Sequence, residues 1–459
     1  MWNFYISDLM KDGLAFLIGI LTCFILVKKG KAKKKIIFVW CGLYIVVAFF
    51  FYLNGYGMKY VDISTINTKM YSKKELEKDF RVLKRYILEK NPVAFTNKSE
   101  LIDMFNETEK KIVDSMTEEE FYHLLNPLVV AVKCGHTNLS ISKALIENRK
   151  DYAVYFPLSV NIEDGKIIVD EENDEYGIKK GHIIKSINGN SSDKILSSFE
   201  KNISHDGENL AIVMNIASKH FGYEYYEFVE KANQFSVELI DTDGLDKKID
   251  LKGEYIEKEN TGAWHLHFED YKDVSYYEYK IDGNEALLTV NVFFEEKEKF
   301  SDFLSGCFSK IKDNGVTRLT IDVRGNFGGE PQMSKELLSY IVKEHTKYFT
   351  DDTKLPFIYK MQGLANDIIP KEDVFTGEIT LLVDGGCFST CGHFAAVFKE
   401  HQLGKIVGTN TGGGASCTDS SINVVLQNTG IRLHNSLSMY SVVADSSMRN
   451  MVVPDEKIE

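Results

Sequence analysis

A short stretch near the C-terminal end of the sequence combines glycines with several nucleophilic side chains. Residues 384–393 read DGGCFSTCGH and follow a run of apolar residues. The side chains in this stretch that could attack a carbonyl carbon are those of Cys387, Ser389, Thr390 and Cys391. Small residues at a strand–helix junction can place one of them at the start of a helix, where the helix N-terminus favours negative charge on a substrate oxygen. The stretch therefore predicts acyl-transfer chemistry and leaves the choice among the four nucleophiles open.

A second glycine-rich stretch occurs earlier in the chain. Residues 322–329 read DVRGNFGG and also follow an apolar run. Glycine allows the backbone N–H groups of such a turn to point toward a ligand, and two N–H donors can hold a developing oxyanion. A tight strand-to-helix turn without any ligand explains the same residues. From these residues alone the two interpretations have equal weight.

The third candidate is a histidine that lies far from both stretches in the sequence. His136 stands in the sequence CGHT, just before a short predicted strand. An isolated histidine is more often structural than catalytic. It can act as the general base for a serine or a cysteine only where the fold brings the two side chains within hydrogen-bond reach.

The elements that must position these residues alternate between strand and helix from about residue 285 onward. Apolar runs at 286–294, 316–325 and 378–386 have the pattern of strands, and helical spacing follows each of them. This order predicts βαβ units with buried parallel strands. Sites in such sheets form at the carboxyl ends of the strands, where both glycine-rich stretches begin.

The part of the chain before residue 285 divides into a helical and a strand-rich region. Capping-box patterns at Ser72 and Thr117 open two predicted helices, and together they indicate a small helical subdomain over residues 72–132. From residue 152 the pattern changes to short strands, and Asn188-Gly189 is a strong signal for a hairpin turn.

The N-terminal end differs from the rest of the chain in charge and in hydropathy. Residues 13–27 and 36–53 are uncharged and largely apolar, and six lysines lie between them at 28–35. The second segment has the length of a membrane-spanning helix, and the first is marginal. The positive-inside rule places the lysine loop in the cytoplasm. The sequence therefore predicts a hairpin of two transmembrane helices, with everything after about residue 56 outside the cytoplasm.

The overall composition excludes several functional classes. The chain has 459 residues, of which 44% are hydrophobic and 26% are charged, and these are values of a globular protein. The formal net charge of −13 argues against nucleic acid as a partner, because binding to phosphates needs basic patches. The cysteines follow no zinc-binding pattern, so we expect neither a metal nor another cofactor.

Taken together, the motifs resemble those of one family, the C-terminal processing (tail-specific) and tricorn-like serine peptidases. The stretches that carry the resemblance are DVRGN-x-GG, LLVDGGCFSTCGHFAAVFKEH, KIVGTNTGGG, CGHT and VVPD, in the family's order. The resemblance implies that Ser389 is the nucleophile. It also implies an oxyanion hole made by a backbone N–H of the Gly328-Gly329 turn and the N–H of Thr390. The implied fold is α/β: a crotonase-like (ClpP-like) spiral core, with a PDZ-like β module suggested by KKGHIIKSINGNSSDKIL.

The sequence departs from the family pattern at two places. Members with a Ser–Lys dyad have a lysine where this chain has Gly414, so a dyad of that kind is not expected. The tricorn-like branch uses a histidine instead, and His136 fits that role. That branch orients its histidine with a glutamate shortly before the PD motif, and residues 446–450 contain no acid here. Asp419 is a weak candidate for the missing orienting residue.

The sequence thus predicts five regions: a transmembrane hairpin (1–57), a stalk (58–71), an N-terminal helical subdomain (72–150), a PDZ-like module (151–205) and a peptidase core (206–459). The predicted function is that of a membrane-tethered, extracytoplasmic serine endopeptidase, with Ser389 as nucleophile and His136 as general base. Its expected partners are a protein or peptide substrate and the membrane. The alternative is a catalytically inactive peptide- or ligand-binding protein on the same scaffold, which the missing lysine and glutamate favour.

Overall fold

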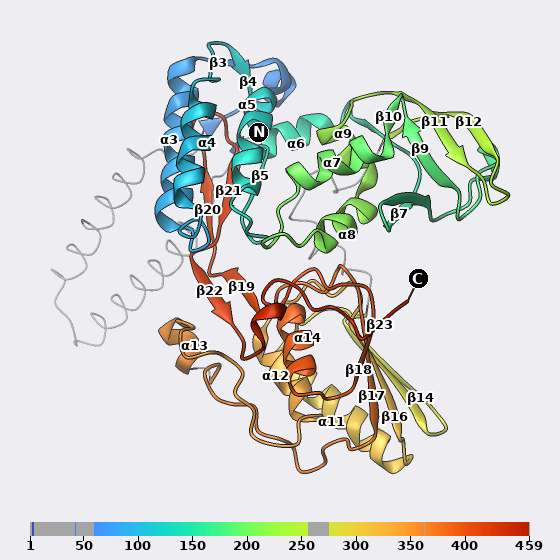
Figure 1. Cartoon of the computed structure of the whole chain (residues 1–459). Helices are drawn as coiled ribbons and strands as arrows, with labels where there is room; N and C mark the ends of the chain where they lie inside the picture. The colour runs from blue at the N-terminus through green and yellow to red at the C-terminus, as the bar shows by residue number, and fades with distance from the viewer. Residues whose placement is uncertain (1, 4–41, 43–58, 256–274, 362, 459) are drawn as a thin grey trace, which may run out of the picture.

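The computed structural model describes residues 2–3, 42, 59–255, 275–361 and 363–458 (Figure 1). Within these residues we find no helix with the length and apolar character needed to cross a membrane. Apart from Gly42, the two predicted transmembrane segments at 13–27 and 36–53 lie outside the described part of the chain.

The N-terminal region is helical, as its capping boxes predict. Its main helices are α3 (Lys73–Lys90), α4 (Lys98–Glu109), α5 (Glu118–Val130) and α6 (Lys143–Arg149). The Glu75 carboxylate accepts the N–H of Ser72 at the start of α3, and Glu120 accepts that of Thr117 at the start of α5. Both capping boxes are therefore formed, and they fix where the two helices begin.

Residues 59–71 differ from the predicted stalk, because they fold onto the helical region. Their elements are β2 (Lys59–Tyr60), which pairs with β1 (Trp2–Asn3), the 3-10 helix η1 (Ile63–Thr68), and β3 (Met70–Tyr71), which pairs with β4 (Met116–Thr117). Ile66 and Tyr71 are buried in the core of the helical region. Burying these apolar side chains stabilises the packing of the segment on the helices, whereas an exposed stalk would leave them in contact with water.

A second region is built on an antiparallel sheet in the order β12-β11-β9-β8-β7, with β10 paired to β9. The strands are β7 (Val160–Glu163), β8 (Lys166–Val169), β9 (Ile183–Ile187), β10 (Asn190–Ser191), β11 (Gln234–Ile240) and β12 (Asp246–Lys252). Three helices share its core, namely α7 (Ser192–Asn202), α8 (Ala211–Lys219) and α9 (Phe221–Phe228). The region extends past residue 205, the boundary that we predict from the sequence, because β11 pairs along β9 and completes the sheet.

The C-terminal region is the predicted α/β part, so the mixed α/β fold class is confirmed. Its sheet has the order β14-β15-β16-β17-β18-β23, and all neighbours are parallel except β14 and β15. The strands are β14 (Tyr277–Asp282), β15 (Glu285–Val290), β16 (Arg318–Asp322), β17 (Glu378–Val383), β18 (Lys405–Gly408) and β23 (Glu456–Lys457). Alternate residues of these strands are buried in one core with α11 (Lys297–Asp313), α12 (Pro331–Ser339) and α14 (Thr390–Glu400). A short helix, α13 (Phe357–Met361), lies between β16 and β17 in the chain.

A long β-arm connects the C-terminal region to the helical region (Figure 1). We use this name for residues 416–441, which contain β19 (Ser416–Asp419), β20 (Ile422–Val425), β21 (Arg432–Asn435) and β22 (Ser438–Ser441). β19 pairs with β22, and β21 pairs with β5 (Asn138–Ser140) from the helical region. Apolar side chains of the β-arm, among them Val424 and Leu433, are buried among the N-terminal helices. The arm therefore brings the C-terminal region next to the strand that follows His136.

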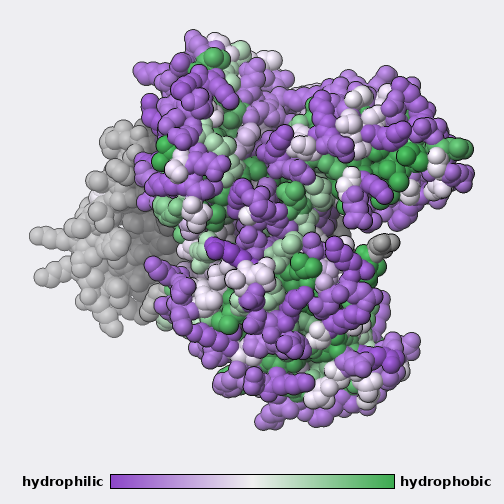
Figure 2. All heavy atoms as spheres, viewed as in Figure 1, coloured by the Kyte–Doolittle hydropathy of each residue, from purple (hydrophilic) through white to green (hydrophobic). Residues whose placement is uncertain are grey.

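The remaining elements are short. β6 (Val154–Tyr155) pairs with β13 (Glu254–Tyr255), and two 3-10 helices cover Asp174–Tyr176 and Ser446–Met448. Figure 2 shows a largely hydrophilic outer surface, which is hollowed between the region of β7–β12 and the C-terminal sheet.

Candidate active site

Ser389 lies where the chain leaves β17 and enters α14. It is the N-cap residue of α14 and has φ 54° and ψ −123°. A positive φ is costly for a residue other than glycine, and it persists where the surrounding structure enforces it, often at functional sites. Here the N–H of Phe388 donates to the Asn326 carbonyl over 3.1 Å, and the N–H of Gly413 donates to the Cys387 carbonyl over 2.9 Å. Two neighbouring loops thus hold Ser389 in a strained conformation at the first turn of the helix.

His136 and Ser389 lie within hydrogen-bond distance of each other. The distance from His136 Nε2 to Ser389 Oγ is 3.0 Å, although the two residues are 253 positions apart in the chain. The imidazole ring stacks on Phe388, with ring centroids 4.5 Å apart. Burial, together with smaller contributions from the nearby His434 and His393, lowers the pKa of His136 to about 3. The imidazole is therefore neutral near pH 7, which is the form that can accept a proton from the serine hydroxyl.

The loop that carries His136 is fixed by hydrogen bonds from two distant elements. Asn91, at the C-terminal end of α3, donates to the Thr137 hydroxyl over 2.8 Å. Ser436, at the base of the β-arm, donates its N–H to the same hydroxyl and its own hydroxyl to the His136 carbonyl, each over 3.2 Å. The backbone of His136 and Thr137 is thereby positioned before any ligand binds.

The second glycine-rich stretch lies directly against the serine. A Cβ atom on Gly328 would stand 2.8 Å from both the Ser389 Cβ and the Thr390 nitrogen, so only glycine fits at this position. The N–H of Gly328 donates to the Asn326 side chain over 2.8 Å, and the hydroxyl of Thr390 donates to the Gly329 carbonyl. The N–H groups of Gly329 and Thr390 have no acceptor among the described residues. Of the predicted donors, these two are therefore the pair that remains available to an oxyanion.

Comparison with known proteins gives a family for this part of the chain. Residues 285–458 match peptidase family S41. This part of the chain is therefore similar to an S41 peptidase domain, and we call residues 285–458 the S41 domain. Its fold is similar to that of mature CPAF, with a TM-score of 0.62 at 14% sequence identity over 84% of this chain and 92% of that chain. Mature CPAF complexed with lactacystin matches with a TM-score of 0.60 at 14% identity, over 84% of this chain and 94% of that chain. No curated protein sequence matches significantly. The family agrees with the resemblance to tail-specific serine peptidases.

Asp419 belongs to the S41 domain, and no hydrogen bond or ion pair joins it to His136 among the described residues. Asp419 is an exposed residue of β19, paired in register with Ser438 of β22. Burial and the charge of Asp419 raise the pKa of Glu330. The same two causes raise the pKa of Tyr359. Asp419 therefore lies beside these two residues, and its geometry gives no support to its predicted orienting role.

The cysteines around the serine are buried thiols. Burial raises the pKa of Cys387 and of Cys417 well above the usual value for a thiol. The Cys387 thiol donates to the Val323 carbonyl over 3.0 Å, and the Cys417 thiol lies next to the Ser389 side chain. A thiol held protonated is a poor nucleophile, so the geometry favours Ser389 among the candidates in this stretch.

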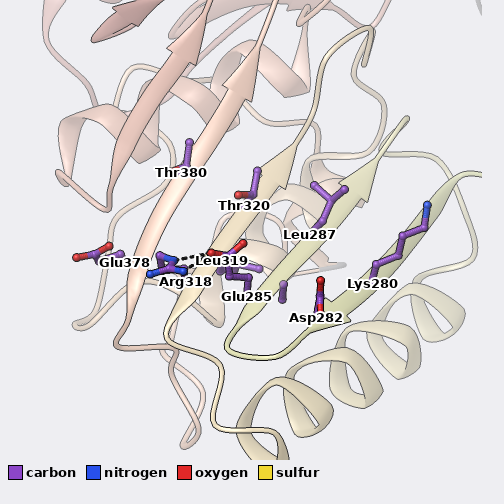
Figure 3. A pocket seen from close by; sticks show the side chains of 10 residues that line it. Lys280, Asp282, Glu285, Leu287, Arg318, Leu319, Thr320, Glu378 and Thr380 are labelled. Carbon is purple, nitrogen blue, oxygen red and sulfur yellow. Dashed lines mark hydrogen bonds and ion pairs between the residues drawn. The ribbon is translucent and has the colours of Figure 1, made fainter.

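A surface hollow on the S41 domain lies at the opposite end of the sheet from the serine (Figure 3). Its lining includes Glu285, Arg318 and Glu378, which are the first residues of β15, β16 and β17. Arg318 and Glu285 form an ion pair across it. Ser389 instead follows the carboxyl end of β17, where sites form in parallel sheets. The hollow in Figure 3 is therefore separate from the candidate active site.

One cluster in the described residues has the composition of a metal site. Side-chain ligand atoms of Glu119, His123 and Glu227 lie within 4.8 Å of one another. Arg149, however, forms ion pairs with both glutamates, and Lys231 forms another with Glu119. These two cations already balance the charge of the carboxylates. The cluster is therefore suited to holding α5, α6 and α9 together rather than to binding a divalent cation.

Sequence reasoning missed the residues that support the pair of Ser389 and His136. Asn91 and Ser436 hold the His136 loop, and Asp206 accepts the N–H of Gly135 over 2.7 Å. Each reads in the sequence as an ordinary cap or turn residue. Only their positions next to the ends of helices and strands could have pointed to them. Many surface residues share such positions, so this feature does not single them out.

Proposed function

We propose that the protein is a membrane-tethered serine endopeptidase whose catalytic pair is Ser389 and His136. The observation that carries the proposal is the 3.0 Å contact between a neutral, buried imidazole and a serine hydroxyl. The serine stands at a strained helix start, beside two backbone N–H groups with no acceptor among the described residues. These are the three parts that acyl transfer needs: a nucleophile, a base and an oxyanion site.

The proposed reaction begins when Ser389 attacks the carbonyl carbon of a peptide bond. His136 Nε2 takes the hydroxyl proton as the Oγ–C bond forms. The N–H groups of Gly329 and Thr390 hold the oxyanion of the tetrahedral intermediate. The imidazolium then gives its proton to the departing amine, which leaves an acyl-enzyme on Ser389. Water releases the acyl group in a second cycle, with His136 again as the base.

We also propose the finer architecture that the family resemblance implies. The S41 domain would be a crotonase-like spiral core, and the sheet of β7–β12 would be a PDZ-like module. What supports the second assignment is a small antiparallel sheet whose outer strands are β7 and β12, packed with the helix α7. In modules of this kind a peptide can add a strand to a sheet edge, and the chain to be cleaved could be presented in this way.

The membrane part of the proposal rests on the sequence of residues 1–57. Two apolar segments flank a loop with six lysines, and the positive-inside rule assigns that loop to the cytoplasm. The peptidase would then act outside the cytoplasm on protein or peptide substrates near the membrane surface.

The test is labelling of the full-length, detergent-solubilised protein with a fluorophosphonate probe, which reacts with activated serines. We expect labelling of the wild type, and a loss of at least about 10³-fold in rate in Ser389→Ala and His136→Ala. Ser309→Ala and His345→Ala serve as matched controls, because both residues are exposed and belong to no part of the site. A folded wild type that is not labelled would overturn the proposal and favour an inactive binding protein.

A further inference from the structure

Asp206 is a buried carboxylate that no step of the proposed mechanism uses. It lies in the loop between α7 and α8 and is 5% exposed. Its Oδ1 accepts the N–H of Gly135, the residue before His136, over 2.7 Å. Its Oδ2 is buried and has no hydrogen-bond partner among the described residues. Buried polar atoms are rarely left without a partner, so such a group needs an explanation.

The surroundings connect Asp206 to the catalytic pair. A Cβ atom on Gly135 would stand 2.6 Å from the Phe388 ring and 3.3 Å from Asp206 Oδ1, so the three residues are in tight contact. The same Phe388 ring stacks on His136 and precedes Ser389 in the chain. Asp206, Gly135, Phe388 and His136 thus form one packed group beside the nucleophile.

The loop of Asp206 is also firmly tied to the S41 domain. The Asn209 side-chain amide donates to the carbonyls of Thr411, Gly412 and Asn450, each over 2.9 Å. The Gly207 N–H donates to the Lys133 carbonyl over 3.1 Å. These bonds hold the carboxylate in place from both sides, so its burial is built into the fold and does not result from a mobile loop.

We propose that Asp206 is a positioning residue for His136, which fixes the Gly135 amide and stabilises the imidazolium formed during catalysis. The proposal rests on the proposed function. When His136 takes the serine proton, positive charge appears in a buried environment, and a carboxylate held against the neighbouring peptide stabilises it. No proton passes to Asp206, which stays ionised throughout. The residue would thus supply the negative charge that Asp419 does not bring to the histidine.

The proposal has a consequence for pH dependence. Burial raises the pKa of Asp206 to about 6, whereas that of His136 is lowered to about 3. Several titratable groups surround the carboxylate. They are the thiols of Cys134 and Cys417, whose pKa the charge of Asp206 raises, and His205 in its own loop. The ion pair between Lys133 and Glu208 also lies there. Burial raises the pKa of both thiols, so they stay neutral. A loss of reactivity as the pH falls through 6 that disappears in Asp206→Asn, a variant that keeps His205, would therefore report Asp206.

The experiment is the rate of fluorophosphonate labelling of Ser389 in the full-length protein between pH 4.5 and 9. For the wild type we expect a rate that falls below about pH 6. In Asp206→Asn, which keeps an acceptor for the Gly135 amide but removes the charge, we expect a rate about 10- to 100-fold lower at pH 8. The decline near pH 6 should also disappear. Glu208→Gln is the matched control, since it removes one charge from the same loop at an exposed position, and it should label like the wild type.

Two results would overturn the proposal while leaving the proposed function intact. One is a wild-type rate, dependent on Ser389 and His136, that stays constant between pH 5 and 8. The other is an Asp206→Asn variant with the wild-type rate and pH profile. Thermal melting of each variant identifies any loss of folding, and the wild-type pH profile tests the proposal without a substitution. Labelling that does not depend on Ser389 would instead overturn the proposed function, and this inference with it.

Discussion

Two buried polar clusters among the described residues differ in whether their charged groups face opposite charges. In the first, which we call the Arg149 cluster, the guanidinium forms ion pairs with Glu227 and Glu119, and neither Arg149 nor the Glu227 side chain is exposed to solvent. The second is the candidate active site. There His136 is hydrogen-bonded to the neutral hydroxyl of Ser389, and one oxygen of Asp206 has no partner among the described residues.

The pKa shifts of the two clusters follow from this difference. Burial alone would lower the pKa of Arg149, but the charge and hydrogen bonding of Glu227 and the charge of Glu119 together outweigh it and raise that pKa well above the usual value. At the active site burial dominates instead, and it lowers the pKa of His136 to about 3 and raises that of Asp206 to about 6. A buried charge that faces opposite charges keeps its charge state and stabilises the fold. Where burial acts without a counter-charge, it leaves groups whose protonation can change during a reaction.

The comparison predicts the largest stability loss for removal of the arginine. Arg149→Met leaves Glu227 buried without its main counter-charge, and the expected loss in the free energy of unfolding is about 3–5 kcal/mol. Denaturant unfolding measures it. Arg318→Met is the matched control: its ion pair with Glu285 is exposed, and such pairs contribute about 0–1 kcal/mol. Equal losses in the two variants would contradict the distinction between the clusters.

A second prediction concerns the close packing at the active site. In Gly328→Ala the new methyl group would meet Ser389 and the Thr390 nitrogen at 2.8 Å, at a position with φ 102°. The nucleophile and the oxyanion donors must then move apart, and we expect labelling to slow by about 10²-fold, which corresponds to ~2.7 kcal/mol. Gly315→Ala is the control, because Gly315 also has a positive φ but has no atom within 4 Å of the added group. Both variants carry backbone strain, but only Gly328→Ala creates a clash at the site. A difference between their labelling rates therefore measures the effect of that clash.

The smallest expected effect comes from Glu224, which lies near the Arg149 cluster but is not paired to it. Burial and the charge of Glu227 raise the pKa of Glu224 to about 8, and its Oε2 has no partner among the described residues. The folded state therefore holds this proton more tightly than the unfolded state does. The stabilisation is complete below the unfolded pKa near 4 and is lost as the pH rises through 8.

Glu224→Gln removes this dependence on pH. We expect the variant and the wild type to melt at similar temperatures at pH 5, and the variant to melt several degrees higher at pH 8.5. Glu175→Gln, at an exposed position, should show no such difference between the two pH values. The contradicting result is a difference in melting temperature between the wild type and Glu224→Gln that is the same at both pH values. It would show that the carboxyl group is not protonated in the folded state.

Local patterns in the sequence predicted local structure well. Both capping boxes formed, and Asn188 and Gly189 adopt the two positive φ angles that the hairpin between β9 and β10 requires. The strand–helix alternation after residue 285 was predicted correctly for the same reason, since hydrophobic periodicity records which face of each element is buried. The choice of Ser389 as nucleophile rests on a resemblance that extends over several motifs, and it stays a prediction.

The supporting contacts could not be predicted in this way. Asp206 and Gly135 are 71 residues apart, and an Asp-Gly pair in a loop indicates only a turn. The β-arm was also missed, because β20 and β21 bury their side chains among helices that lie some 300 residues earlier in the chain. The hydrophobic pattern of such a short strand indicates that one face is buried, but it does not indicate which element covers that face.

The β-arm also sets the order in which the active site can be assembled during synthesis. Ser436 and Asn435, which hold the loop of His136 and its neighbour Asn91, leave the ribosome long after Ser389 has emerged. A nascent chain that has emerged only as far as residue 389 therefore contains Ser389 and His136, but not the groups that hold the loop of His136. We expect the contact between Ser389 and His136 to form only after the β-arm has been synthesised.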